Sequence, residues 1–174
     1  CERWVPATAA PSAASPTRRV PIRCEIAIAS TSTLDATSAA TNNDRVVAWY
    51  WRHGDSPRPT IVLVHGFLAP WWEVNEFYLG IRFLYDLGCD VVLKTLPHNG
   101  PRARSAKRVS GMGFFSRGVD ALNHAVVQST YDIRTLVDVL QQRGVKKIGL
   151  SGVSLGGYTT ALMAGLDERF DFVM

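Results

Sequence analysis

The chain has 174 residues, of which 47% are apolar and 20% are charged, a composition typical of one globular domain with a sizeable core. No run approaches the roughly 18 consecutive apolar residues that span a bilayer, so we expect no membrane span, and no secretory signal is visible. The excess charge, +4 in all, lies in one segment that holds Arg102, Arg104, Lys107 and Arg108. We interpret this segment as a solvated loop rather than a nucleic-acid-binding face; electrostatic attraction of anionic substrates is the alternative.

The cysteines point to no disulfide framework. Cys1, Cys24 and Cys89 are widely spaced and form no C-x-x-C pair, which also argues against a cysteine zinc site. No two histidines have the spacing of metal ligands, and we predict no metal and no cofactor. The cysteine content predicts a reducing, cytoplasmic setting. Cys1 as the first residue leaves two interpretations open, a cut point or the lipidated N-terminus of a bacterial lipoprotein.

The first 41 residues differ in composition from the rest. In this segment 25 residues are Ala, Ser, Thr or Pro, and few large apolar side chains are present to offset the entropy of ordering the chain. We predict a low-complexity, disordered N-terminal segment at 1–41, with a weak strand at 22–29 that places Cys24, Ile26 and Ile28 on one face. Residues 42–174 are expected to form a folded domain.

From residue 45 onward, strand and helix patterns alternate. The strands are predicted at 45–52, 60–64, 90–96, 146–151 and 170–174, and the helices at 73–87, 120–143 and 158–166. The strand at 60–64 has no polar face, as in parallel strands that are buried on both sides. A long loop at 97–118 is a candidate site element. Alternating strands and helices predict an α/β fold with a parallel sheet.

A short motif separates the strand at 146–151 from the helix that follows. It reads Gly152-Val153-Ser154-Leu155-Gly156, which is G-x-S-x-G. A sharp strand-to-helix turn brings the residues two before and two after the serine so close together that only glycine fits there. The turn exposes the serine hydroxyl beside the positive end of the helix. We interpret Ser154 as a nucleophile; a Gly/Ser-rich turn without chemistry is the alternative.

A second motif, His65-Gly66-Phe67, follows the buried strand at 60–64. With both motifs in this order, the chain resembles the α/β-hydrolase superfamily over about residues 45–174. In that superfamily an H-G-x loop follows the third strand and the nucleophile elbow follows the fifth. The resemblance implies a three-layer α/β-hydrolase fold with a mostly parallel sheet, here incomplete and represented by about strands 1 to 6.

The resemblance also implies roles for individual residues. The backbone N–H groups of Phe67 and Leu155 would form the oxyanion hole, and Gly66 would allow the loop to approach closely. Gly152 and Gly156 would be the structural glycines of the turn. In the superfamily the histidine of this loop braces it, so His65 is expected to brace rather than to act as a base.

The segment Leu96-Pro97-His98-Asn99-Gly100-Pro101-Arg102 resembles a loop of a bacterial hydrolase subgroup. It follows the strand at 90–96, at the edge where open α/β sheets bind ligands. His98 and Arg102 are therefore candidate substrate-binding residues, with an ordinary loop as the alternative. The apolar segment 110–115 is a candidate wall of the acyl pocket.

A serine nucleophile needs a base, and the base needs an acid that orients it. In the α/β-hydrolase fold both follow the nucleophile along the chain. No histidine occurs after His124, and residues 170–174 only begin a sixth strand. We therefore expect a C-terminally truncated fragment whose acid and histidine lie beyond residue 174. Expressed alone, it is expected to fold poorly and to lack esterase activity.

These patterns predict a serine hydrolase that cleaves carboxylic esters through an acyl-enzyme on Ser154. The expected partner is a small-molecule ester or a related acyl compound, and no nucleic acid. A non-catalytic α/β-hydrolase-like protein that binds or scaffolds is the alternative, because the chain offers a nucleophile without a base. The sequence identifies neither the substrate nor the oligomeric state.

Overall fold

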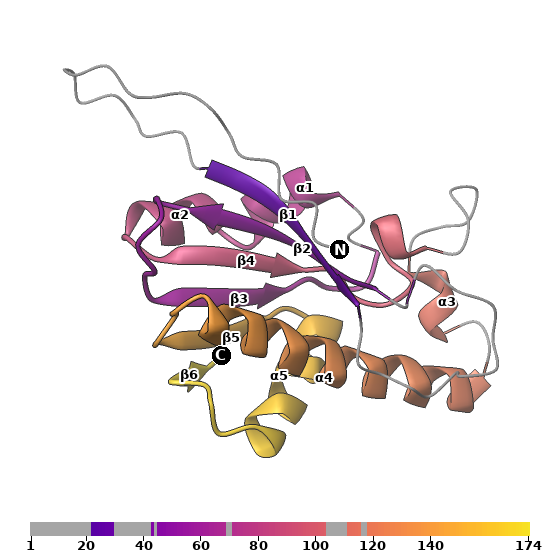
Figure 1. Cartoon of the computed structure of the whole chain (residues 1–174). Coiled ribbons are helices and arrows are strands. Elements are labelled where there is room, and N and C mark those ends of the chain that lie inside the picture. Colours follow the sequence, from indigo (N-terminus) through magenta and orange to yellow (C-terminus); the bar gives the residue numbers. More distant parts are fainter. Residues whose placement is uncertain (1–21, 30–42, 44, 69–70, 104–110, 116–117) are drawn as a thin grey trace.

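The structure is a computed structural model that describes residues 22–29, 43, 45–68, 71–103, 111–115 and 118–174. The predictions for Cys1, for disorder at 1–21 and 30–41, and for Arg104, Lys107 and Arg108 fall outside these ranges. Within them, six strands form one sheet with helices on both faces (Figure 1). This is the three-layer α/β architecture that the sequence predicts.

The strands are β1 (Ile22–Ala29), β2 (Arg45–Arg52), β3 (Thr60–Val64), β4 (Asp90–Lys94), β5 (Ile148–Gly152) and β6 (Phe172–Val173). Their order across the sheet is β1-β2-β4-β3-β5-β6. β3, β4, β5 and β6 run parallel, whereas β2 is antiparallel to both β1 and β4. Because β3 lies between β4 and β5, the segments that follow these three strands meet at one edge of the sheet, called here the carboxyl edge.

The helices are α1 (Trp72–Tyr78), α2 (Ile81–Asp86), the 3-10 turn η1 (Gly100–Arg102), α3 (Met112–Phe115), α4 (Gly118–Gln142) and α5 (Leu155–Leu166). The single helix predicted at 73–87 is wrong. Gly80 adopts a left-handed backbone, with φ of +61°, and separates α1 from α2. Phe77 of α1 is 87% exposed.

The core has two halves, one on each face of the sheet. Successive side chains of β3 point to opposite faces. Ile61 and Leu63 pack in a cluster with Ile81 and Tyr85 of α2, while the alternate residues of β3 pack against α4 and α5. All five residues of β3 are buried, which confirms the predicted burial of this strand on both faces.

The other predicted elements are present, most of them with shifted ends, whereas η1 and α3 lie in the segment 97–118 that the sequence predicts as a loop. β1 forms where the weak strand was predicted, and Ile26 is buried in the core. The helix predicted at 120–143 is α4, on which Ile133, Leu136 and Leu140 are each fully buried. α5 begins at Leu155 rather than at residue 158, so the helix starts directly after Ser154. In the described ranges, no helix has the length and apolarity needed to cross a membrane.

Candidate active site at the carboxyl edge of the sheet

Ser154 occupies the junction between β5 and α5 in a strained backbone conformation. Its φ is 57° and its ψ is −118°, outside the regions that L-residues ordinarily adopt. A serine at the start of a helix usually caps it through its hydroxyl, but Ser154 makes no such hydrogen bond. Its side chain is exposed at the carboxyl edge. The hydroxyl is thus presented to the outside rather than used to begin the helix.

The two glycines of the motif are required by close backbone contacts. A Cβ on Gly152 would lie 2.5 Å from the carbonyl group of Gly156, and a Cβ on Gly156 would lie 2.1 Å from the carbonyl oxygen of Val64. Real Cβ atoms do not approach backbone atoms so closely, and the backbone cannot rotate away as a side chain can. The turn at Ser154 can therefore be made only with glycine at both positions.

The loop after β3 lies directly against Ser154. A Cβ on Gly66 would be 3.4 Å from the Ser154 Cβ and 3.3 Å from the Val153 carbonyl oxygen. Phe67 follows in this loop, and Leu155 follows Ser154 in α5. Among the described residues, neither the Phe67 N–H nor the Leu155 N–H donates a hydrogen bond. Within the described ranges, the Leu155 N–H beside Ser154 and the Phe67 N–H of the adjoining loop are thus unpaired, and the positive end of α5 lies beside the serine.

His65 joins the loop after β3 to the loop after β4. Its Nδ1–H donates to the Gly66 carbonyl oxygen at 2.7 Å, and its Nε2 accepts the Leu96 N–H at 3.1 Å. Burial lowers the pKa of His65 to about 4, opposed by the hydrogen bond to Gly66 and assisted by the cations of Lys94 and Arg102. The ring is therefore neutral at pH 7. With both nitrogens engaged, it can brace the loop but has no nitrogen available to act as a base.

The loop after β4 holds His98 in another left-handed conformation, with φ of +60°. The side-chain amide of Asn43 makes two hydrogen bonds to His98. Its Nδ2–H donates to His98 Nδ1, and its Oδ1 accepts the His98 N–H, both at 2.9 Å. His98 is half-buried. The structure thus brings this candidate residue to the same edge as Ser154.

Arg102 lies in a position that the sequence does not predict. We expected it in a solvated loop, but its side chain is completely buried and pairs with Asp132 of α4. The expectation of a solvated Arg102 is therefore wrong. A buried guanidinium can affect the substrate only through other residues. Sequence reasoning also missed Lys94 and Asp132, because their partners lie far away along the chain.

Aromatic side chains cover the loop after β3. The rings of Phe67 and Phe115 meet edge to face, with centroids 4.9 Å apart, and the Phe114 ring lies 5.5 Å from that of Phe115. Phe114 is buried, whereas Phe115 and Met112 are exposed. The described part of segment 110–115, a candidate wall of the acyl pocket, therefore lies next to Phe67.

Three residues other than glycine have positive φ among the described residues, and all three lie at the carboxyl edge. Leu68 follows β3, His98 follows β4 and Ser154 follows β5. Such conformations cost free energy and persist only where the surroundings hold them, and they cluster at functional sites. Their common position identifies this edge as the candidate functional site.

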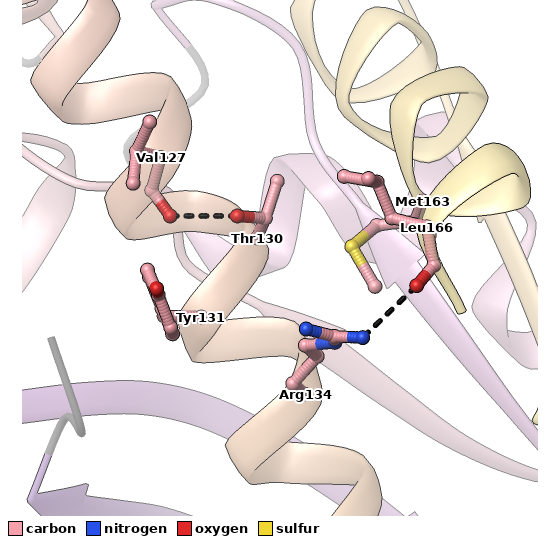
Figure 2. Close-up of a pocket in the computed structure, with 6 residues that line it drawn as sticks. All are labelled: Val127, Thr130, Tyr131, Arg134, Met163 and Leu166. Atoms are coloured by element: carbon pink, nitrogen blue, oxygen red, sulfur yellow. Dashed lines mark hydrogen bonds between the residues drawn. The ribbon is translucent and has the colours of Figure 1, made fainter.

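Two other features lie away from this edge. His53 Nδ1 contacts the Asp90 carboxylate at 2.9 Å, but Asp90 is the first residue of β4 and so lies at the opposite edge of the sheet. A surface pocket lies between α4 and α5 (Figure 2), lined by Val127, Thr130, Tyr131, Arg134, Met163 and Leu166. Leu166 ends α5, about 18 Å along the helix from Ser154.

In the described ranges, no three His, Cys, Asp or Glu side chains gather as a metal site.

The fold is that of known hydrolases. A cold-adapted esterase from an Arctic intertidal metagenomic library matches with a TM-score of 0.62 at 16% identity, over 87% of this chain and 58% of that one. A Pyrococcus furiosus esterase gives 0.58 at 14% identity, over 88% and 50%. A dienelactone hydrolase-like promiscuous phosphotriesterase from metagenomic libraries gives 0.57 at 17% identity, over 87% and 57%. These likenesses establish the fold, an α/β architecture with a mostly parallel sheet.

At the level of sequence, the chain is similar to uncharacterized proteins of Mycobacterium tuberculosis, from strains CDC 1551/Oshkosh and ATCC 25618/H37Rv. Each is 36% identical over 132 residues, which is 74% of this chain and 31% of the relative. The chain therefore spans about a third of the length of the curated relatives it matches. No protein-family model matches the chain.

Proposed function

We propose that this chain carries the nucleophile and the oxyanion hole of a serine hydrolase that cleaves carboxylic esters. The observation that carries the proposal is the backbone of Ser154, strained and exposed at a strand-to-helix junction, with glycines at both flanking positions where no Cβ fits. A turn of this kind costs stability, and capping α5 does not explain it, because the Ser154 hydroxyl makes no capping bond.

In the proposed reaction, the Ser154 Oγ attacks the carbonyl carbon of the ester while its proton passes to a base. The carbonyl oxygen becomes an oxyanion, and the N–H groups of Leu155 and Phe67 donate hydrogen bonds to it, beside the positive end of α5. The intermediate then expels the alcohol, which takes the proton from the base, and leaves the acyl group on Ser154. Attack by water, activated by the same base, releases the acid and restores the serine.

We propose that neither His65 nor the His53–Asp90 pair supplies the base. His65 is excluded because both of its ring nitrogens are engaged, and the His53–Asp90 pair because it lies at the opposite edge of the sheet. The region matched in the M. tuberculosis relatives is only 31% of their length. We propose that the base and its orienting acid belong to the natural protein beyond these 174 residues.

The proposal is tested by ester hydrolysis with the full-length natural protein, using p-nitrophenyl esters of increasing acyl length. Ser154→Ala should lower kcat/KM at least about 1,000-fold. The matched control is Ser129→Ala, which removes a buried hydroxyl that donates to the Ala125 carbonyl of its own helix. Activity that survives in Ser154→Ala would contradict the proposal. A folded wild-type protein without any turnover would favour the non-catalytic binding protein instead.

A further inference from the structure

Three charged side chains without solvent exposure form a cluster on the α4 side of the carboxyl edge. They are Lys94 at the end of β4, Arg102 in η1 and Asp132 on α4. The Asp132 carboxylate accepts from Arg102 Nη1 at 2.5 Å and lies 3.4 Å from Lys94 Nζ, and Gln128 donates to its other oxygen at 2.8 Å. Buried charges are costly even when paired, and replacing such a cluster by well-packed apolar residues is often neutral or stabilising.

Arg102 connects three parts of the chain that are distant in sequence. Besides Asp132, its guanidinium donates to the Thr95 carbonyl at 3.0 Å and to the Asn43 carbonyl at 2.9 Å. One planar group thus ties α4, the end of β4 and the segment before β2 together. A lysine at this position could not reproduce this, because the forked geometry of guanidinium is what makes several fixed directions available at once.

Asn43 carries this connection on to His98. Its carbonyl group is held by Arg102, and its side chain makes the two hydrogen bonds that fix the ring and the backbone of His98. A histidine at φ of +60° adopts that conformation only where its surroundings impose it. The chain of contacts Asp132, Arg102, Asn43 and His98 provides the constraint.

His98 and its neighbour in turn hold α3 against the loop after β3. A Cβ on Gly113 would lie 2.9 Å from the His98 ring, so α3 rests directly on it. A Cβ on Gly111 would lie 2.8 Å from Asn99 Oδ1 and 3.0 Å from the Phe67 ring. The contacts that start at Arg102 therefore end on Phe67.

We propose that Arg102, anchored by Asp132, is a positioning residue. Through Asn43, His98 and α3 it holds in place the loop after β3, which carries the Phe67 N–H. The proposal rests on the function proposed above. It replaces direct substrate binding by Arg102 with an indirect role: the guanidinium does not contact the substrate but fixes the residues that pack against Phe67. His98 transmits this position as part of the same network.

The test uses the full-length protein and two readouts, the rate constants of Ser154 labelling by a fluorophosphonate and hydrogen exchange of individual segments. Arg102→Met should lower the maximal labelling rate at least about 10-fold with little change in probe affinity, and it should speed exchange at 96–103 and 111–115 but not in β3 or β5. The control is Arg134→Met, which breaks the partly exposed ion pair between Arg134 of α4 and Asp167 at the end of α5. It should change neither readout.

A second variant keeps the test decisive if Arg102→Met does not fold. Asn43→Ala retains the carbonyl group that Arg102 binds but releases His98, so it should reproduce both effects with the ion cluster intact. Labelling and exchange that stay as in the wild type in the folded variants would overturn the proposal, and so would a uniform rise in exchange without a change in labelling. A wild-type protein that is not labelled would contradict the proposed function. In that case hydrogen exchange alone would test whether Arg102 positions the loop after β3.

Discussion

Gly156 lies so close to Val64 that a Cβ on Gly156 would fall 2.1 Å from the Val64 carbonyl oxygen. The contact joins the first turn of α5 to the end of β3. It therefore sets the distance between Ser154 and the loop that carries Phe67. Any side chain at residue 156 would push these two segments apart.

Gly156→Ala should accordingly destabilise the protein by more than about 2 kcal/mol, because the clash is with backbone and cannot be relieved by a rotamer change. Gly165→Ala is the matched control: it lies on the same helix, and a Cβ there meets nothing within 4 Å. That change should stabilise α5 by up to about 1 kcal/mol, since alanine favours helix more than glycine does. Urea unfolding of both variants measures the difference; similar stabilities would contradict the close packing at Val64.

Stability should fall as the pH is lowered from about 6.5 to about 4 because of His65. Burial lowers its pKa to about 4, whereas an unfolded histidine titrates near 6.5. In this window the unfolded chain binds more protons than the folded one, so acid favours unfolding. The contribution of His65 is fully present above pH 6.5 and should fall by about 2 kcal/mol by pH 4.5.

The measurement is the difference in unfolding free energy between the wild type and His65→Gln at pH 7 and at pH 4.5. The variant cannot titrate, so the advantage of the wild type should shrink at the lower pH. His124→Gln, a change at an exposed histidine on α4, is the matched control. A constant difference for His65→Gln would mean that this ring is not held neutral.

The buried ion cluster predicts opposite effects for its members. Among the described residues, two cations share the single carboxylate of Asp132, and burial lowers the pKa of Lys94 to about 8 despite that carboxylate. Lys94→Met should stabilise the protein by about 1 kcal/mol or more, because it removes a buried charge and leaves a balanced pair. Asp132→Asn should cost about 3 to 5 kcal/mol, because two buried cations lose their partner. Thermal unfolding of both variants tests the sign; destabilisation by Lys94→Met would contradict it.

Much of the fold could be predicted from local patterns. The strand at 60–64 has no polar face, which already implies burial on both faces, and the glycines around Ser154 indicate a turn with no room for a Cβ. Both depend on residues close together in sequence. The proposed nucleophile was found in this way, and its chemical role stays a prediction.

The features that were missed depend on contacts across the chain. Arg102 stands among prolines and glycines and reads as a loop residue, but its partner Asp132 lies 30 residues away on α4. The break at Gly80 could not be foreseen either, since one glycine inside a helical pattern fixes no φ. Lys94 at a strand end gives no local indication of burial, because the carboxylate that offsets the cost of burying its charge comes from α4.

The central claim, that Ser154 is an activated nucleophile, is tested most directly by mass spectrometry of the full-length protein after reaction with a fluorophosphonate. The account predicts one added phosphonyl group on the peptide that contains Ser154, with no adduct in Ser154→Ala and full labelling in Ser129→Ala. A natively folded protein that gains no adduct, or one labelled equally in Ser154→Ala, would contradict it.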